Sequence, residues 1–218
     1  MLDVAIIGCG VVGAAAAYEL SHYPLHVAVL EAENDVADGT TKANSAILHA
    51  GYDPEPGTQM ARLNVQGVAL AKEICARLDV PYRQCGSLVL ALSQAELPHL
   101  KKLYANGVAN GVPGIRLLTA EETLAMEPQL APTAAGALFA PSAAIVSPWE
   151  FALAMAEVAV RNGGELHLSS PVTGIQKTAS GWALTTPSPA VQAADHAKRQ
   201  LCGPLCGQCG GTERPGHP

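Results

Sequence analysis

The stretch DVAIIGCGVVG at residues 3–13, followed by VAVLE at residues 27–31, decides the fold of this chain. Residues 4–7 form a short apolar run that ends at a glycine, which is typical of a strand buried on both faces. The glycine spacing GxGxxG predicts a tight turn into a helix, and residues 27–30 predict a second, parallel strand. Together they predict a βαβ unit.

The residues of this unit suit the binding of a dinucleotide. Gly8 allows a sharp turn, Gly10 allows the backbone to approach a pyrophosphate, and Gly13 leaves room for the helix to pack on the strand. The start of the helix offers free N–H groups to phosphate oxygens. Glu31 ends the second strand, where its carboxylate can accept hydrogen bonds from ribose hydroxyls and disfavours a 2′-phosphate. NAD or FAD is therefore expected before NADP, with a purely structural βαβ unit as the alternative.

Composition narrows the class of protein. The 218 residues are 49% hydrophobic but only 4% aromatic, which predicts an aliphatic, alanine-rich core. The net charge of −6 without a basic run argues against a nucleic-acid partner. The longest apolar run, residues 4–17, contains glycines and is too short to span a membrane, and no basic leader precedes it. We therefore expect a cytoplasmic protein without a transmembrane segment.

Candidate strands later in the chain extend the βαβ unit. Residues 165–168 follow a predicted helix and should form a third parallel strand, whereas residues 172–177 and 182–185 suggest an antiparallel flap. The region from about residue 80 to 146 mixes short strands and helices, which indicates an insertion. The fold class is thus α/β.

A second motif, TTKANSAILHAGY at residues 40–52, carries a family resemblance together with the glycine turn. Over residues 1 to about 186 the chain resembles FAD-dependent oxidoreductases of the D-amino-acid oxidase superfamily. It is most similar to the branch of glycerol-3-phosphate dehydrogenase/oxidase and L-2-hydroxyglutarate oxidase. The resemblance implies an FAD/NAD(P)-binding Rossmann-like domain at residues 1–80 and 147–186, with an inserted α+β portion of the substrate domain at residues 81–146.

The resemblance also implies roles for individual residues, with FAD as the cofactor. Gly8, Gly10 and Gly13 would hold the pyrophosphate, and Glu31 would bind the adenosine ribose. The backbone of Val172 would contact the adenine. The loop residues Thr40, Thr41 and Ser45 would lie along the pyrophosphate, ribityl chain and flavin. For Thr40, Thr41 and Ser45, an ordinary turn or structural role is the alternative.

His49 is the catalytic candidate that the resemblance implies. It would lie near the substrate carbon at the flavin and take the hydroxyl proton, because imidazole can bind and release a proton near neutral pH. The implied reaction oxidises a CH–OH group of a small anionic substrate, glycerol 3-phosphate first and 2-hydroxyglutarate second. Electrons would pass to oxygen, a quinone or another carrier. Without the family pattern, His49 in its apolar run would be a core histidine.

The pattern changes after Thr186. Complete members of the superfamily are longer and add a second glycine-rich segment near the C-terminus, so we interpret the chain as C-terminally truncated, with an irregular tail at residues 187–218. The tail has three cysteines, Cys202, Cys206 and Cys209, with His196 or His217 as a possible fourth metal ligand. Four well-spaced ligands indicate a zinc site and three thiols in an irregular segment do not, so we expect no metal. A catalytically inactive nucleotide-binding fragment is therefore the alternative to an active enzyme.

Overall fold

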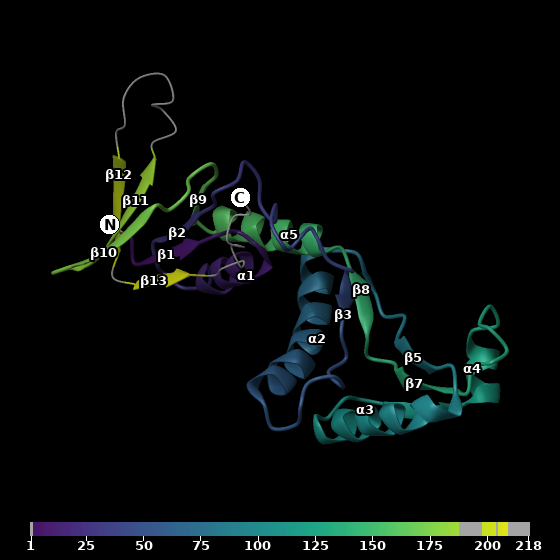
Figure 1. The fold of residues 1–218 in the computed structure, drawn as a ribbon. Helices are drawn as coiled ribbons and strands as arrows, with labels where there is room; N and C mark the ends of the chain where they lie inside the picture. The colour runs from purple at the N-terminus through teal and green to yellow at the C-terminus, as the bar shows by residue number, and fades with distance from the viewer. Residues whose placement is uncertain (1, 188–197, 204, 209–218) are drawn as a thin grey trace, which may run out of the picture. The chain divides into compact units, whose positions relative to one another are not determined.

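The computed structural model describes residues 2–187, 198–203 and 205–208, which belong to two compact units. The first unit is built from Met1–Ser45 and Pro148–Pro218, and the second from Ala46–Ser147. Figure 1 labels the helices and strands and colours the chain from purple at the N-terminus to yellow at the C-terminus.

A four-stranded parallel sheet forms the centre of the first unit. Its strands, in spatial order, are β13 (Leu205–Gln208), β1 (Val4–Ile7), β2 (Val27–Leu30) and β9 (Glu165–His167). All neighbouring pairs are parallel, so the third strand predicted at residues 165–168 is confirmed as β9 beside β2. Every residue of β2 is buried, which explains its uninterrupted apolar sequence.

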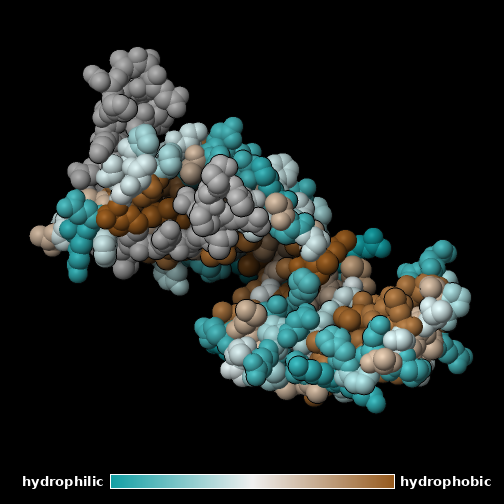
Figure 2. All heavy atoms as spheres, viewed as in Figure 1, coloured by the Kyte–Doolittle hydropathy of each residue, from teal (hydrophilic) through white to brown (hydrophobic). Residues whose placement is uncertain are grey.

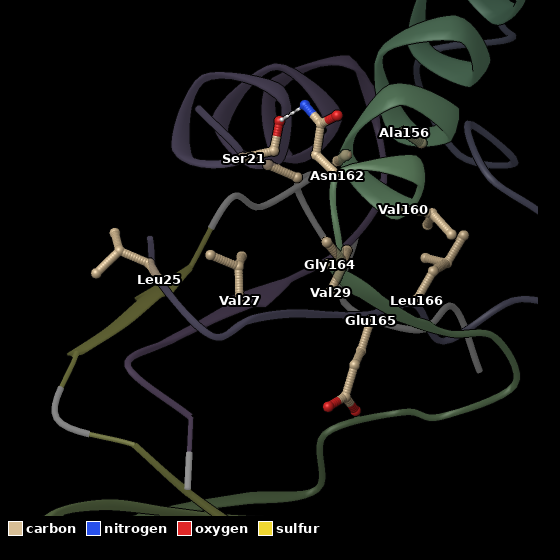
Figure 3. Close-up of a pocket in the computed structure, with 12 residues that line it drawn as sticks. Ser21, Leu25, Val27, Val29, Ala156, Val160, Asn162, Gly164, Glu165 and Leu166 are labelled. Carbon is tan, nitrogen blue, oxygen red and sulfur yellow. Dashed lines mark hydrogen bonds between the residues drawn. The ribbon is translucent and has the colours of Figure 1, made fainter. Parts of the chain in front are cut away.

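Helices cover one face of this sheet. The helices α1 (Val11–Leu20) and α5 (Pro148–Arg161) contact each other on the face that carries Val27 and Val29. Figure 3 shows the crevice between them, where Asn162 Nδ2 donates a hydrogen bond to Ser21 Oγ at 3.1 Å. The enclosed space is about 10 Å³, room for no more than about one water molecule, so this crevice is a packing defect and not a ligand site.

An antiparallel flap covers the opposite face. Its strands pair in the order β10 (Gly174–Thr178), β11 (Gly181–Pro187) and β12 (Lys198–Gly203). Leu184 of β11 packs into a buried cluster that the sheet completes with Leu2, Ala5, Ala28 and Leu30. The flap predicted at residues 172–177 and 182–185 is confirmed by β10 and β11. The α/β fold class is also confirmed.

The turn between β1 and α1 is so tight that two of its positions require glycine. Gly8 has a φ of +92°, and its N–H donates to the carbonyl oxygen of Leu30 at 2.8 Å. A Cβ atom at Gly13 would lie 2.0 Å from the carbonyl oxygen of Gly8. A side chain at Gly13 would therefore force α1 away from β1.

The tail differs from the irregular segment that the sequence analysis expects after residue 186. Two strands lie within it: β12 pairs antiparallel with β11, and β13 pairs parallel with β1. Strand pairing needs backbone N–H and C=O groups but no apolar periodicity, and an unpaired strand edge offers rows of both. Residues 188–197, 204 and 209–218 lie outside the described residues.

The second unit contains two three-stranded antiparallel sheets and three α-helices. The sheets have the orders β3-β8-β4 and β5-β7-β6. The strands are β3 (Ile47–Leu48), β4 (Tyr82–Arg83), β5 (Ser87–Ala91), β6 (Arg116–Thr119), β7 (Gly136–Ala140) and β8 (Ala144–Val146). The helices are α2 (Gln59–Leu78), α3 (Leu97–Ala109) and α4 (Ala120–Met126), with a short 3₁₀ helix at Gln94–Glu96.

The second unit has its own hydrophobic core. Helix α3 packs on the β5-β7-β6 sheet through Leu100 and Leu103, and Tyr52 joins the same cluster. A capping box begins α4, since Thr119 Oγ1 accepts from the Glu122 N–H at 3.2 Å and the Glu122 carboxylate accepts from the Thr119 N–H at 2.8 Å. Figure 2 shows that apolar atoms also reach the surface of both units. Among the described residues, no helix is long and apolar enough to cross a membrane.

The first of the two boundaries between the units lies earlier in the chain than the sequence predicts. Contacts divide the chain after Ser45 and Ser147, whereas the sequence suggests boundaries after residues 80 and 146. Residues 46–80 join the second unit because β3 pairs with β8 and α2 contacts β4. These contacts are between segments far apart in the sequence, so local patterns do not reveal them.

We predict that Gly13→Ala destabilises the chain by about 3 kcal/mol or more, because its Cβ would overlap a backbone oxygen that cannot move independently of β1. Urea unfolding followed by circular dichroism measures the change. The control is Gly67→Ala in α2, where a Cβ meets nothing within 4 Å and should raise stability by roughly 0.5–1 kcal/mol. Equal stability of the wild type and Gly13→Ala would contradict the close approach of β1 and α1.

Candidate functional site

Glu31 lies at the carboxyl end of β2 with its carboxylate turned toward the glycine turn. Glu31 Oε2 accepts a hydrogen bond from the Cys9 N–H at 2.5 Å, and Oε1 accepts one from the Glu33 N–H at 2.9 Å. The residue is only 8% exposed. Because a carboxylate has about four acceptor positions, about two remain for a ligand. The structure therefore brings the acid to the glycine turn, and its role in binding ribose stays a prediction.

The start of α1 is suited to an anion. Its N-cap is Gly10, which contributes no side-chain cap, and the N–H of Val11 donates to Thr41 Oγ1 at 2.9 Å. None of the first-turn residues of α1, all of them described, is acidic. The positive end of the helix dipole is therefore not neutralised by a carboxylate on its own first turn. Thr41 is buried beside this helix start, where its hydroxyl orients the first turn.

The loop that carries Thr40 and Thr41 is fixed by two further contacts. The Ala37 N–H donates to the carbonyl oxygen of Cys9 at 2.9 Å, which ties the loop to the glycine turn. Asn44 Nδ2 donates to the carbonyl oxygen of Thr41 at 2.6 Å. Asn44 is not among the predicted site residues, although an asparagine in a polar turn is a known signal for such a bond.

Three predicted cofactor residues have less defined surroundings. Thr40 and Ser45 are exposed, and Thr40 lies in the same turn as Thr41. Val172 follows β9, is half-buried, and packs against the cluster that contains Leu30. Contacts of these three residues with a cofactor stay predictions.

His49 follows β3 in the second unit and is exposed. Side chains alternate along this segment, since Ile47 is exposed, Leu48 is half-buried, His49 is exposed and Ala50 is buried. This pattern rules out the alternative of a buried core histidine. The imidazole is accessible to a ligand, and its catalytic role stays a prediction.

The segment after His49 is held by Asn110, the C-cap residue of α3. Asn110 Nδ2 donates to the carbonyl oxygens of Gly51 at 2.9 Å and of Pro54 at 2.8 Å. Both side-chain hydrogens of the amide are thus used to fix one loop. Nothing near Asn110 in the sequence indicates a partner in a segment so much earlier in the chain, so the sequence does not predict its role.

Cys9 lies inside the glycine turn with no exposed surface. Burial, followed by the negative charges of Glu31 and Asp35, raises the pKa of its thiol from 9.0 to about 12. The thiol is therefore neutral at physiological pH and behaves as a small apolar residue rather than a nucleophile. Its backbone N–H, not its sulfur, contributes to the site.

We predict that iodoacetamide at pH 8 labels the exposed Cys85 at least tenfold faster than Cys9 in the native chain, and both at similar rates in urea. Timed alkylation and mass spectrometry of the separate peptides measure both rates. The pKa of the Cys9 thiol is higher in the folded chain than in the unfolded chain. Below about pH 9 the thiol is neutral in both states and does not change the free energy of unfolding. As the pH rises from about 9 toward about 12 it ionises in the unfolded chain alone, which favours unfolding. Labelling of native Cys9 as fast as that of Cys85 would contradict the buried turn.

Among the described residues, no group of three or more His, Cys, Asp or Glu side chains could hold a metal ion. Of the residues weighed in the tail, Cys209, His196 and His217 lie outside the described residues, and for Cys202 and Cys206 only the backbone is described.

Comparisons with known proteins agree with this geometry. The family described as "DAO: FAD dependent oxidoreductase" matches residues 3–203, past residue 186, where the resemblance seen in the sequence ends. A glycerol 3-phosphate dehydrogenase of Caloramator mitchellensis is 49% identical over 186 residues, which are 85% of this chain and 39% of that protein. The human mitochondrial L-2-hydroxyglutarate dehydrogenase is 38% identical over 80% of this chain and 38% of its own length.

A solved structure shows the same fold. The dithionite-reduced L-alpha-glycerophosphate oxidase of Mycoplasma pneumoniae with FAD bound matches with a TM-score of 0.80 at 30% identity, over 88% of this chain and 51% of that one. The chain thus spans about two-fifths of the length of the curated relatives named above and about half of this structure. With a family match over nearly its whole length, the chain belongs to the FAD-dependent oxidoreductases of the DAO family.

Proposed function

We propose that this chain binds the ADP half of FAD in its first unit and takes part in oxidising a CH–OH group of a small anionic substrate. The observation that carries the proposal is the hydrogen bond between the Glu31 carboxylate and the Cys9 N–H, which joins the acid to the glycine turn. Glycerol 3-phosphate is the first candidate substrate and 2-hydroxyglutarate the second, in line with the names of the relatives.

The residues present fit the ADP half of FAD. Gly8, Gly10 and Gly13 leave the start of α1 open to a pyrophosphate, because a Cβ at Gly10 would lie 3.1 Å from Thr41 Oγ1 and crowd that approach. Thr40, Thr41 and Ser45 would line the path from the pyrophosphate to the flavin. Glu31 would accept hydrogen bonds from the ribose, and the Val172 backbone would contact the adenine.

When bound, FAD would supply a two-electron acceptor for the hydride from the substrate carbon. His49 would take the proton from the substrate hydroxyl as the C–H bond breaks, which an exposed imidazole can do from either ring nitrogen. Asn110 would keep the loop after His49 in place through its two hydrogen bonds. The electron acceptor (oxygen, a quinone or another carrier) and a cytoplasmic location stay predictions.

The alternative is a nucleotide-binding fragment without turnover. This alternative is kept because the chain spans less than half of the length of the relatives named above. The proposal of an active enzyme rests on the residues described above. Binding of FAD and turnover are therefore tested separately.

We predict that Glu31→Gln weakens FAD binding by about 10- to 100-fold, because an amide has one acceptor oxygen and no charge in place of the carboxylate. Quenching of flavin fluorescence on titration with the purified chain measures Kd. Glu33→Gln makes the same change at an exposed position two residues away and should leave Kd within about twofold. If the wild type fails to bind FAD, the proposed function is wrong.

We predict that His49→Asn lowers the rate of flavin reduction by substrate about 10²- to 10⁴-fold with FAD affinity unchanged, because it removes the group that takes the hydroxyl proton. Anaerobic reduction of the bound flavin by glycerol 3-phosphate, followed by its absorbance, measures the rate. The matched control is His99→Asn on the exposed side of α3, which should retain the wild-type rate. A chain that binds FAD but is never reduced by either candidate substrate would favour the nucleotide-binding alternative.

A further inference from the structure

Three asparagines of this chain are each followed by a glycine: Asn106–Gly107, Asn110–Gly111 and Asn162–Gly163. In such a pair the backbone nitrogen of the glycine can attack the side-chain carbonyl carbon of the asparagine. The new C–N bond closes a succinimide ring, the side-chain nitrogen leaves as ammonia, and water then opens the ring to aspartate or isoaspartate. Glycine favours the attack because it has no hindering side chain and a permissive backbone. The surroundings of each pair therefore decide which of them reacts in the folded chain.

The pair Asn106–Gly107 is protected by its helix. Both residues lie inside α3, so the Gly107 N–H takes part in the hydrogen bonds of the helix. Gly107 is also buried, and a Cβ atom there would lie 2.3 Å from Ile115 Cδ1. The Gly107 nitrogen can therefore attack only after α3 has opened at its contact with the core of the second unit.

The backbone does not distinguish the two other pairs. Each pair ends a helix, since Asn110 is the C-cap residue of α3 and Asn162 comes directly after α5. Gly111 and Gly163 have φ values of +78° and +99°. The N–H of each glycine donates to the carbonyl oxygen three residues earlier, at 3.1 Å and 3.0 Å respectively. A difference in reactivity must therefore come from the asparagine side chains.

The side chain of Asn110 is held by two hydrogen bonds. Asn110 Nδ2 donates to the carbonyl oxygens of Gly51 and Pro54, and the residue is half-buried. Both bonds must break before the Asn110 Cγ atom can turn toward the Gly111 nitrogen. Each bond that must break lowers the reactive population by about fivefold. The contacts that fix the loop after His49 therefore also protect Asn110.

Asn162 is held less firmly. The residue is exposed, and its one side-chain hydrogen bond among the described residues runs from Nδ2 to Ser21 Oγ at 3.1 Å (Figure 3). Gly163 is exposed too, and a Cβ atom there would meet nothing within 4 Å. The surroundings of this pair therefore leave open space for the succinimide ring, and one hydrogen bond fewer has to break than at Asn110.

The connection from α5 to β9 leaves little room for a longer main chain. The Gly164 N–H donates to the carbonyl oxygen of Ala159 at 2.9 Å, and a Cβ atom at Gly164 would lie 2.8 Å from that oxygen. Strand β9 begins at the next residue and pairs with β2, and its His167 carbonyl oxygen accepts from the Glu31 N–H at 2.9 Å. Isoaspartate at position 162 inserts one CH₂ group into the main chain just before this turn, so the turn and β9 cannot both keep their positions.

We propose that Asn162–Gly163 is the site at which this chain deamidates, and that isoaspartate formed there weakens the pairing of β9 with β2. Aspartate at the same position has a smaller effect. It removes the donor to Ser21 Oγ and places a negative charge at the C-terminal end of α5, but it leaves the length of the main chain unchanged. The reaction consumes water, releases ammonia and needs no cofactor, so the inference does not depend on the proposed function.

The first test follows the three pairs separately. The purified chain is kept at pH 8, and mass spectrometry of its peptides measures the replacement of NH₂ by OH at each asparagine over time. Asn162 should react at least about fivefold faster than Asn110, which has one more hydrogen bond to break, and Asn106 should be the slowest. In urea, where the contacts of the folded chain are lost, the three rates should agree within about twofold. Equal rates at Asn110 and Asn162 in the native chain, or a faster reaction at Asn106, would overturn the assignment.

A variant of the neighbouring helix tests the role of the hydrogen bond. Ser21→Ala removes the acceptor of the Asn162 side chain and should speed the reaction at Asn162 by up to about fivefold, while Asn110 reacts as before. A slower reaction at Asn162 in this variant would contradict the argument from side-chain contacts.

The second test measures the effect on β9 by urea unfolding before and after incubation. The urea midpoint of wild type in which Asn162 has reacted should fall, and by more than in Asn162→Asp, which carries the charge without the longer main chain. Asn162→Gln keeps an amide but places its carbonyl carbon one bond farther from the Gly163 nitrogen, so its midpoint should survive the incubation. An unchanged midpoint of the reacted wild type, or an equal fall in Asn162→Gln, would overturn the proposed weakening of the sheet.

Discussion

The close approach of α1 to the end of β1 is the constraint on which the first unit depends. The carbonyl oxygen of Gly8 lies where a Cβ of Gly13 would be, so helix and strand meet backbone to backbone. That contact points the open end of α1 toward the edge of the sheet where β2 also ends. Glu31 then reaches the Cys9 N–H from the neighbouring strand, and the loop with Thr41 closes over the start of the helix. The features of a dinucleotide site thus follow from one steric condition.

The parts of the fold that the sequence predicts are those with local physical causes. A glycine at φ +92° and a strand buried on both faces each impose a composition that can be read over a few residues. The same holds for the strands of the flap. Around the site, these local signals were enough to place Gly8, Gly13 and Glu31 at one turn.

The parts that the sequence does not predict depend on pairings between distant segments. Residues 46–80 belong to the second unit because β3 and β4 both pair with β8, which lies far along the chain. The strands of the tail form at open sheet edges, where the backbone of the partner matters more than the side chains of the strand. Asn110 carries no local signature either, since its hydrogen bonds reach a loop that lies much earlier in the chain.

The residues proposed to bind the cofactor and the residue proposed to transfer the proton come from different units. Most of the residues proposed to bind the ADP half of the cofactor lie within residues 8–41, which hydrogen bonds within the first unit hold together. The candidate for proton transfer, His49, follows β3 in the second unit. Because the two sets share no hydrogen bond among the described residues, a substitution in one need not disturb the other. The proposed binding of FAD and the proposed proton transfer by His49 can therefore be tested by separate substitutions.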